Sequence, residues 1–411
     1  MGRINLALID NNIRYLENLS GFIMEKYNHR FKLHTFSDID TFIRYFDGEK
    51  PSPEIAVVSN VLYSARLKSL DIGMILVIRD GHGVSYGEQH SGNFDCSLDS
   101  GSRLSSSCVG VNGCGGGNSF GGVNYDGAMV LERYVDADSF VGSILKSYAD
   151  KEGFQDESVS KGIYETKIIL VMSPSGGTGR TSVSLGLCPL FSRMVPSVLY
   201  LNLDRASFDN PKSDSTNSSG GMSDIIFATK SRREKLPLLL EAFKREYAGG
   251  RYSYYPPPVF PMDIDELNAG EIEFLIESIR SLGLFSRVVI DTQSGLSNIN
   301  KTLLELSDDI FIVVDCSPFG IKKLISLRGH MDRALMDQAK HIYKRICVLL
   351  NKANADWHSS DLESQINEQA FRSKVALLPY CEEISDIFSA DLLSDVRNDF
   401  GRALAEAVKS C

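Results

Sequence analysis

The first eighty residues alternate short apolar runs with stretches in which apolar positions recur at helical spacing. The apolar runs are "INLALID" (4–10), "KLHTF" (32–36), "EIAVVS" (54–59) and "GMILVI" (73–78). Between the first two runs, the apolar positions that recur every three or four residues are Ile13, Leu16, Leu19, Ile23 and Met24. Alternating strands and helices are typical of a parallel sheet. The pattern therefore predicts a small, doubly wound α/β domain.

Glycine and serine dominate the following segment, residues 81–127. Such a composition cannot bury enough apolar surface to offset its conformational entropy. We therefore expect a disordered insertion, and we expect that removing residues 82–126 leaves thermal stability nearly unchanged. The pattern resumes at residues 128–148 with a last strand and helix, which completes a domain over residues 1–148. A polar linker, residues 149–163, follows.

From Tyr164 onward the same alternation returns on a larger scale and predicts a second α/β domain, residues 164–411. Its apolar runs are "KIILVM" (167–172), "VLYLNLD" (198–204), "RVVID" (287–291), "DIFIVVD" (309–315), "RICVLLN" (345–351) and "KVALLPY" (374–380). Near-continuous apolar runs, in place of strict alternation, indicate strands that are covered by helices on both faces. The second domain is therefore also predicted to be doubly wound, with a mostly parallel sheet.

Charge and hydropathy exclude several classes of function. The formal net charge is −10, and neither half of the chain has the basic excess that binding to a phosphate backbone needs. No apolar stretch approaches the ~18 residues of a membrane span, and the start of the chain lacks a signal-peptide profile. Residues 391–411 could form an amphipathic helix, but their charge is not basic, which favours packing on the sheet over membrane binding. We expect a cytoplasmic protein.

The segment "SPSGGTGRTS", residues 173–182, lies between a predicted strand and a predicted helix. Backbone N–H groups and the helix dipole converge at such a place and favour a phosphate. Three glycines would let the backbone close around the anion: Gly176, Gly177 and Gly179. Thr181 is the candidate magnesium ligand, but Arg180 stands where such loops carry lysine, and Pro174 stands at the first glycine position. From the loop alone, a plain glycine turn is an equal alternative.

Two aspartates at the ends of other predicted strands favour the nucleotide interpretation. Asp291 closes one strand and could hold the magnesium shell, while Asp204 closes a neighbouring strand and could position water or metal. Aspartate also ends strands as a turn former or a helix cap. Doubly wound sheets, however, bind ligands at the carboxyl ends of their strands, where the loop and both carboxylates would meet.

Four motifs resemble, in their order, the deviant Walker A, A′, Walker B and adenine-contact segments of the ParA/MinD family of ATPases. They are "SGGTGRTS", "LYLNLD", "RVVIDTQSG" and "VLLNKAN". The segments "GMSDIIFATKSRREKL" (221–236) and "PPPVFPMDIDEL" (256–267), with a receiver-like domain in front, are similar to the TadZ/CpaE proteins of tight-adherence (Flp) pilus assembly. The resemblance covers nearly the whole chain apart from the glycine-rich segment.

The resemblance implies a set of roles in binding ATP with Mg²⁺. Residues that would hold the phosphates are Gly176, Gly177, Thr178, Gly179, Arg180, Thr181 and Ser182. Asn351 would meet the adenine, and Asp204 corresponds to the aspartate credited with hydrolysis. Thr181 and Asp291 would hold Mg²⁺ through the bound ATP.

Three positions depart from the family pattern. Ser175 replaces the signature lysine that reaches the partner's nucleotide in a dimer, Arg180 replaces the second lysine, and Gln293 replaces the proline after the Walker B aspartate. A planar guanidinium keeps the charge of lysine but not its geometry. An error of ~1 Å in placement can cost about 100-fold in rate. We therefore predict ATP binding with slow or absent hydrolysis, which leaves open whether the protein is an enzyme.

The first domain resembles response-regulator receivers, which implies a flavodoxin-like fold, but it lacks their phosphorylation site. Of the acidic cluster that holds magnesium in receivers only Asp10 is present, Ser59 stands at the phosphoacceptor position, and Arg133 stands where a lysine is expected. A serine there excludes acyl-phosphate chemistry. The domain is therefore predicted to be a pseudo-receiver that offers a docking surface.

The resemblance as a whole implies an ATP-binding localisation and assembly factor of a pilus secretion system. Such a factor would be a homodimeric scaffold that contacts pilus machinery proteins and reaches a cell pole or the inner face of the membrane only through them, without nucleic acid. Two alternatives stay open. One is an active ParA/MinD-type ATPase that cycles on DNA or membrane, and the other is an interaction adaptor with a dead nucleotide site.

Overall fold

The computed structural model describes residues 3–46, 51–79, 128–133, 135–151, 164–205, 221–247, 252–354, 359–382 and 390–410. The chain divides into two compact units, residues 3–140 and 141–411. Because this division falls inside helix α3 (Ala137–Ala149), the domain bounds expected from the sequence stay a prediction. The segment 81–127, predicted to be disordered, and most of the predicted linker lie outside the described residues.

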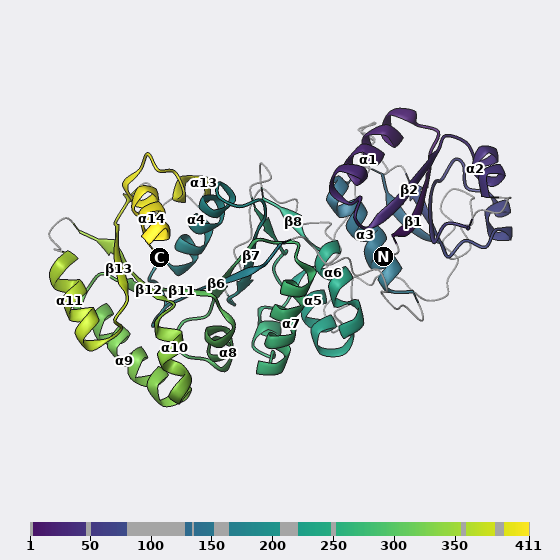
Figure 1. Ribbon diagram of the computed structural model, residues 1–411. Coiled ribbons are helices and arrows are strands. Elements are labelled where there is room, and N and C mark those ends of the chain that lie inside the picture. Colours follow the sequence, from purple (N-terminus) through teal and green to yellow (C-terminus); the bar gives the residue numbers. More distant parts are fainter. Residues whose placement is uncertain are drawn as a thin grey trace, which may run out of the picture. The chain divides into compact units, whose positions relative to one another are not determined.

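The first unit is built on a five-stranded sheet in the order β2-β1-β3-β4-β5, with every neighbouring pair parallel. Its strands are β1 (Ile4–Ile9), β2 (Phe31–Phe36), β3 (Ile55–Ser59), β4 (Met74–Arg79) and β5 (Met129–Glu132). Helices α1 (Ile13–Lys26) and α2 (Ile39–Phe46) lie on opposite faces of this sheet (Figure 1). The doubly wound arrangement predicted for this part of the chain is confirmed.

Strands β4 and β5 are parallel neighbours, with Leu76 beside Met129 and Arg79 beside Glu132 in the ladder. The chain must therefore return from the carboxyl end of β4 to the amino end of β5. Such a connection needs about a dozen residues or more. The glycine-rich segment is thus part of an obligatory crossover, and it cannot be treated as an insertion that is simply removable.

The second unit contains an eight-stranded sheet in the order β13-β12-β11-β6-β10-β7-β9-β8. Its strands are β6 (Lys167–Met172), β7 (Val198–Leu203), β8 (Arg245–Glu246), β9 (Ser253–Tyr254), β10 (Arg287–Thr292), β11 (Asp309–Asp315), β12 (Ile346–Ala353) and β13 (Lys374–Pro379). Among the strands in the described residues, β8 and β9 pair in the antiparallel direction, and the other neighbours are parallel. The predicted α/β class with a mostly parallel sheet is confirmed.

Helices cover both faces of this sheet, which explains its near-continuous apolar strands (Figure 1). One face carries α4 (Arg180–Ser192), α13 (Ala390–Leu393) and α14 (Asp399–Ser410). The other carries α7 (Ala269–Leu282), α8 (Asn298–Leu306) and α9 (Pro318–Leu335), while α5 (Met222–Ser231), α6 (Leu236–Ala242), α10 (Ala339–Tyr343) and α11 (Ser359–Gln369) complete the helical layers.

The last helix, α14, is part of the core of this unit. Its apolar residues Phe400, Leu404 and Ala407 are buried in one cluster with residues of α4 and of the strands. This packing is the arrangement that the sequence favours for the end of the chain. Within the ranges that the structure describes, no helix has the length and apolar character that crossing a bilayer requires.

The strand order positions the candidate site. The central strand β6 lies between β11 and β10. The strands that follow it first in the chain, β7 to β10, lie on one side of β6, and β11 to β13 lie on the other side. In doubly wound sheets, ligands bind at such a switch point, outside the carboxyl ends of the strands. The loop that follows β6 lies at this point.

Candidate functional site

The loop after β6 has the backbone conformation that its glycines permit. Gly177 and Gly179 have φ angles of +76° and +83°, in the left-handed region that favours glycine. A Cβ on Gly179 would also lie 2.3 Å from Nδ2 of Asn351. Gly179 then forms the N-cap of α4, whose first N–H groups have no partners within the helix. The loop therefore presents backbone donors at the carboxyl edge of the sheet.

The end of β12 holds this loop in place. Asn351 donates from Nδ2 to the carbonyl of Thr178 at 2.8 Å, and Lys352 donates from Nζ to the carbonyl of Gly177 at 2.8 Å. Asn351 is buried, so that its expected contact with adenine stays a prediction. Lys352 is not among the site residues that the sequence predicts. Its place directly after the apolar run, beside the predicted Asn351, is the signal that could have identified it.

A cavity of about 670 Å³ opens beside the loop. Its lining residues are Ser173, Gly176, Gly177, Thr178, Gly179, Arg180, Thr181, Asp204, Arg205, Gln293, Ser294 and Lys352. Small-molecule sites typically measure about 300–1,000 Å³. The structure thus brings most of the predicted site residues together around one cavity, while Ser182, Asp291 and Asn351 do not line it.

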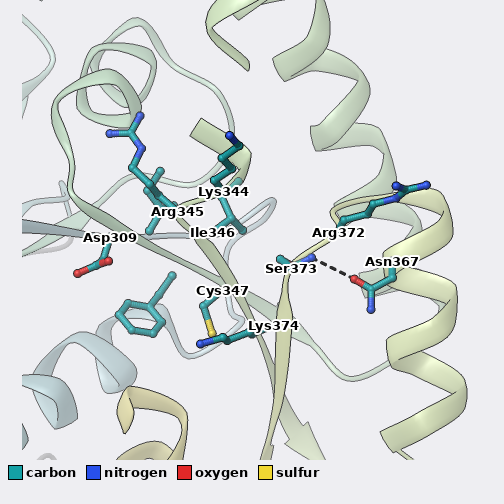
Figure 2. Close-up of a pocket in the computed structure, with 11 residues that line it drawn as sticks. Asp309, Lys344, Arg345, Ile346, Cys347, Asn367, Arg372, Ser373 and Lys374 are labelled. Atoms are coloured by element: carbon teal, nitrogen blue, oxygen red, sulfur yellow. Dashed lines mark hydrogen bonds between the residues drawn. The ribbon is translucent and has the colours of Figure 1, made fainter. Parts of the chain in front are cut away.

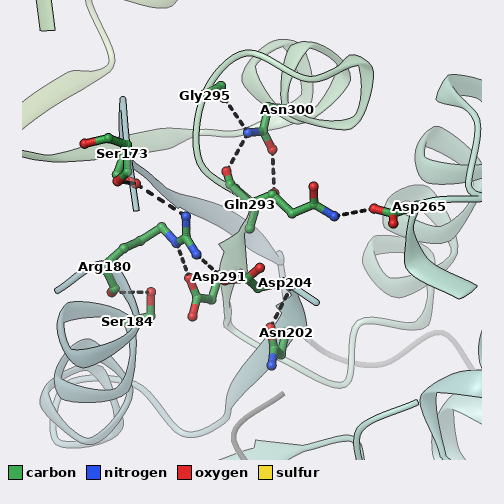
Figure 3. Close-up of polar contacts among 12 residues, drawn as sticks. Ser173, Arg180, Ser184, Asn202, Asp204, Asp265, Asp291, Gln293, Gly295 and Asn300 are labelled. Atoms are coloured by element: carbon green, nitrogen blue, oxygen red, sulfur yellow. Dashed lines mark hydrogen bonds and ion pairs between the residues drawn. The ribbon is translucent and has the colours of Figure 1, made fainter. Parts of the chain in front are cut away.

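The side chain of Arg180 turns toward the ends of the neighbouring strands (Figure 3). Its Nε donates to Oδ1 of Asp291 at 2.7 Å, and one terminal nitrogen forms an ion pair with Oδ2 of Asp204. The other terminal nitrogen lies 3.4 Å from Oγ of Ser173. Arg180 is 9% exposed, and the guanidinium therefore bridges two carboxylates in a nearly closed space.

Asp291 lies deeper than the cavity. It is fully buried, and Tyr200 donates from its hydroxyl to Oδ2 of Asp291 at 3.1 Å. Burial raises the pKa of Asp291, whereas the charge of Arg180 and hydrogen bonds from Thr181 and Arg180 oppose that rise. The pKa of the neighbouring Cys188 thiol is also raised, by burial and then by the charge of Asp291. The carboxylate therefore lies in apolar surroundings with Arg180 as its counter-charge.

This arrangement does not fit a magnesium ion at Asp291. Mg²⁺ demands near-octahedral oxygen coordination and usually takes one or two carboxylates together with water and phosphate oxygens. Both oxygens of Asp291 already accept hydrogen bonds, from Arg180 and from Tyr200. Thr181 and Asp291 are neighbours, because Thr181 hydrogen-bonds to the Asp291 carboxylate, but the guanidinium of Arg180 pairs with that same carboxylate.

Asp265 fixes the outer wall of the cavity. Its carboxylate pairs with Nε of Arg205 at 2.6 Å and accepts a hydrogen bond from Nε2 of Gln293 at 2.7 Å. These two hydrogen bonds lower the pKa of Asp265. Asn300 then donates to the carbonyl of Gln293 at 2.7 Å, which ties down the loop after β10. Gln293, which stands where the sequence analysis expects proline, thus connects the loop after β10 to Asp265 at the edge of the cavity.

A second cavity, of about 420 Å³, lies at the opposite end of the strands (Figure 2). It is lined at the amino ends of β11, β12 and β13, with Lys344, Arg345, Arg372 and Lys374 as its basic residues. Arg345 donates to main-chain carbonyls at the end of α8, among them that of Leu304 at 3.3 Å. Because the glycine loop and both strand-end aspartates belong to the other edge, this cavity is not the predicted site.

The first unit has a buried ion pair at the carboxyl end of its sheet. Arg133 lies 2.8 Å from Oδ2 of Asp10, and both side chains are buried. The other oxygen of Asp10 accepts a hydrogen bond from the N–H of Asn12 at 2.8 Å. Ser59, at the end of β3, is fully buried. The negative charge of Asp10, at what we call the acidic corner of the first unit, is therefore compensated by Arg133 of the same chain.

Comparison with known proteins connects the second unit to one family. The CbiA family, described as the CobQ/CobB/MinD/ParA nucleotide binding domain, matches residues 169–393, more than half of the chain. No curated relative matches the sequence.

Several solved structures are similar to the chain. A ParA family ATPase from Chlorobium tepidum TLS is 18% identical and has a TM-score of 0.47, with 61% of this chain and 99% of that chain covered. The septum site-determining protein MinD with Mg-ADP from Pyrococcus horikoshii OT3 is 16% identical, with a TM-score of 0.45 and coverage of 60% and 95%. MinD in a MinC:MinD complex from Aquifex aeolicus is 13% identical, with a TM-score of 0.44 and coverage of 59% and 94%.

Proposed function

Because the chain belongs to the family of CobQ/CobB/MinD/ParA nucleotide binding domains, we propose that its second unit binds ATP and hydrolyses it slowly or not at all. The observation that carries this proposal is the bridge from Arg180 to Asp291 and Asp204. Arg180, which is expected to contact phosphate, is paired with Asp204, which is expected to serve hydrolysis, and with Asp291, which is expected to hold Mg²⁺.

Other donors that face the cavity would bind the phosphates. The loop after β6 ends at the first turn of α4, where N–H groups without helical partners attract an anion. Lys352 and Arg205 line the same cavity. Their side chains are 44% and 58% exposed, so that each can change its rotamer to contact a bound ligand. We assign to these two cations the charge that Ser175 and Arg180 do not supply.

Hydrolysis is disfavoured by the state of Asp204. A carboxylate that positions attacking water must be able to accept a hydrogen bond from that water. In this chain an oxygen of Asp204 is paired with Arg180. Ser175 also adds no charge at the position of the signature lysine, so that a source of transition-state stabilisation is missing.

For the whole protein we propose a localisation and assembly factor of a tight-adherence pilus secretion system that acts as a homodimeric scaffold. Support comes from the resemblance of residues 221–236 and 256–267 to TadZ/CpaE proteins, together with the receiver-like first unit. The buried pair of Arg133 with Asp10 favours a first unit that docks partners without phosphorylation. Recruitment to a cell pole or to the membrane would then occur through the pilus machinery.

The experiment that tests the proposal compares two lysine variants in ATP binding. We expect one ATP per chain in equilibrium dialysis and almost no phosphate release. Lys352→Ala should weaken binding about tenfold, because it removes a phosphate-facing charge and a bond to the loop. Lys344→Ala is the matched control, since Lys344 lines the cavity at the other edge of the sheet.

Each alternative gives a different result in the same experiment. Steady phosphate release that Lys352→Ala abolishes would indicate an active ATPase and contradict the slow-hydrolysis proposal. Absence of ATP binding would leave an interaction adaptor with a dead site. Weaker binding in Lys344→Ala but not in Lys352→Ala would move the nucleotide to the opposite cavity.

A further inference from the structure

We propose that the Arg180 guanidinium takes the place of a divalent cation, so that this chain holds its nucleotide without Mg²⁺. The inference rests on the proposed ATP site and specifies its cofactor requirement. It starts from the disagreement between the expected magnesium ligands and the contacts that Asp291 makes.

The guanidinium has the shape that the two carboxylates require. Within one planar group, its Nε pairs with Asp291 while one terminal nitrogen pairs with Asp204. Asp291 is the penultimate residue of β10 and Asp204 follows β7, its parallel neighbour, so that the sheet itself fixes the spacing of the pair. A rigid fork of donors that spans two carboxylates is a property of arginine, whereas lysine offers one compact charge.

Burial keeps Arg180 in this position. Asp291 is fully buried beside Tyr200 and Cys188, in surroundings that raise the pKa values of all three side chains. If Arg180 turned to a phosphate, Asp291 would lose its counter-charge inside the protein. An unpaired buried charge is strongly unfavourable. The guanidinium therefore stays with the carboxylates when an anion enters the cavity.

The nucleotide then meets a site whose carboxylate charge is already compensated. Two carboxylates without a cation would repel the phosphates, and Mg²⁺ relieves that repulsion in sites that take the metal. Here Arg180 supplies the positive charge from within the protein, and Lys352 and Arg205 face the cavity. Added Mg²⁺ consequently has no open carboxylate at Asp291 to bind.

The test measures binding of a non-hydrolysable ATP analogue by calorimetry in EDTA and in excess Mg²⁺. The wild-type chain should bind with affinities that agree within about twofold in the two conditions. Arg180→Lys should bind about tenfold more tightly with Mg²⁺ than with EDTA, because an ammonium cannot span both carboxylates. Arg193→Lys is the control: it alters an exposed arginine beyond the other end of α4, which bonds Ser394, and should remain insensitive to Mg²⁺.

Manganese provides a second measurement that needs no nucleotide. Electron paramagnetic resonance should detect no tight Mn²⁺ uptake by the wild-type chain and uptake by Arg180→Met, whose carboxylates are open. This outcome supports the inference whether or not ATP binds, so that a failure of the proposed function can be told apart from a failure of the inference. Mn²⁺ uptake by the wild-type chain that Asp291→Asn removes, or a wild-type affinity for the analogue that rises tenfold or more with Mg²⁺, would overturn it.

Discussion

Removing the charge of Arg180 should make stability depend on pH. In Arg180→Met, Asp291 stays buried without its cation, so that its folded-state pKa rises further above the unfolded value of 3.8. A raised carboxyl pKa favours the folded state below pH 3.8, and that stabilisation is lost as the pH rises through the folded-state value. We expect the variant to lose little at low pH and about 3–5 kcal/mol at neutral pH. Denaturant unfolding at pH 5 and pH 8 measures the difference.

Arg180→Lys serves as the control for this prediction, because it keeps a positive charge near Asp291. Its loss of stability should be smaller than that of Arg180→Met and should change less with pH. An equal loss for Arg180→Met at both pH values would indicate a packing defect and contradict the charge argument.

The sequence predicts part of this site. The position of the loop, and the meeting of Asp204 and Asp291 at one edge, follow from the order of apolar runs and glycines, because parallel strands end together. The direction of the Arg180 side chain does not follow from the sequence, since it depends on the spacing of β7 and β10 and on the burial of Asp291. The contact of Lys352 with the loop depends likewise on a backbone turn, with φ at +60°.

Among the secondary-structure elements, strands with long apolar runs are predicted well from the sequence, whereas strands of two residues are not predicted. The runs expected at residues 167–172 and 309–315 coincide with β6 and β11. Strands β8 and β9 contain two residues each, which is too short for a period-two pattern, and tertiary contacts with β7 define them. The parallel direction of β4 and β5 agrees with the doubly wound domain predicted from the sequence, but their register, with Arg79 beside Glu132, is a property of the pair that the apolar pattern does not contain.

The direction of β5 changes the prediction for the glycine-rich segment. Deleting residues 82–126 leaves only residues 80, 81, 127 and 128 between Arg79 and Met129. A crossover between parallel strands needs about a dozen residues or more. We now expect this deletion to displace β5 and lower the melting temperature, whereas deleting residues 94–116 should leave it nearly unchanged. Thermal melts of both variants check this, and equal melting temperatures for the longer deletion and the full chain would refute the crossover argument.

The two units of the chain share one arrangement of charges. Each has a mostly or wholly parallel sheet whose carboxyl edge carries a buried arginine paired with an aspartate: Arg133 with Asp10 in the first unit and Arg180 with Asp291 in the second. Sequence comparison identifies the positions at which acidic and basic residues depart from the family pattern. It does not show that the substituted arginines compensate the carboxylates that remain.

The first unit should consequently ignore chemical mimics of phosphorylation. Beryllium fluoride with Mg²⁺ stabilises a receiver by completing a phosphate-like group on an acceptor carboxylate, and Ser59 offers none. We expect no change in the melting temperature of the nucleotide-free chain when the reagent is added. The double variant Ser59→Asp with Arg133→Lys, which restores an acceptor and a lysine, is the comparison. A shift in the wild-type chain would contradict the pseudo-receiver interpretation.

The pair of Arg133 with Asp10 also bears on how the protein would be controlled over time. A receiver with an open acidic corner reports the activity of a kinase, and its surface alternates between two states. A corner whose aspartate is already paired with an arginine offers no such input. We therefore expect the surface of the first unit to be the same whether or not a phosphate donor is present.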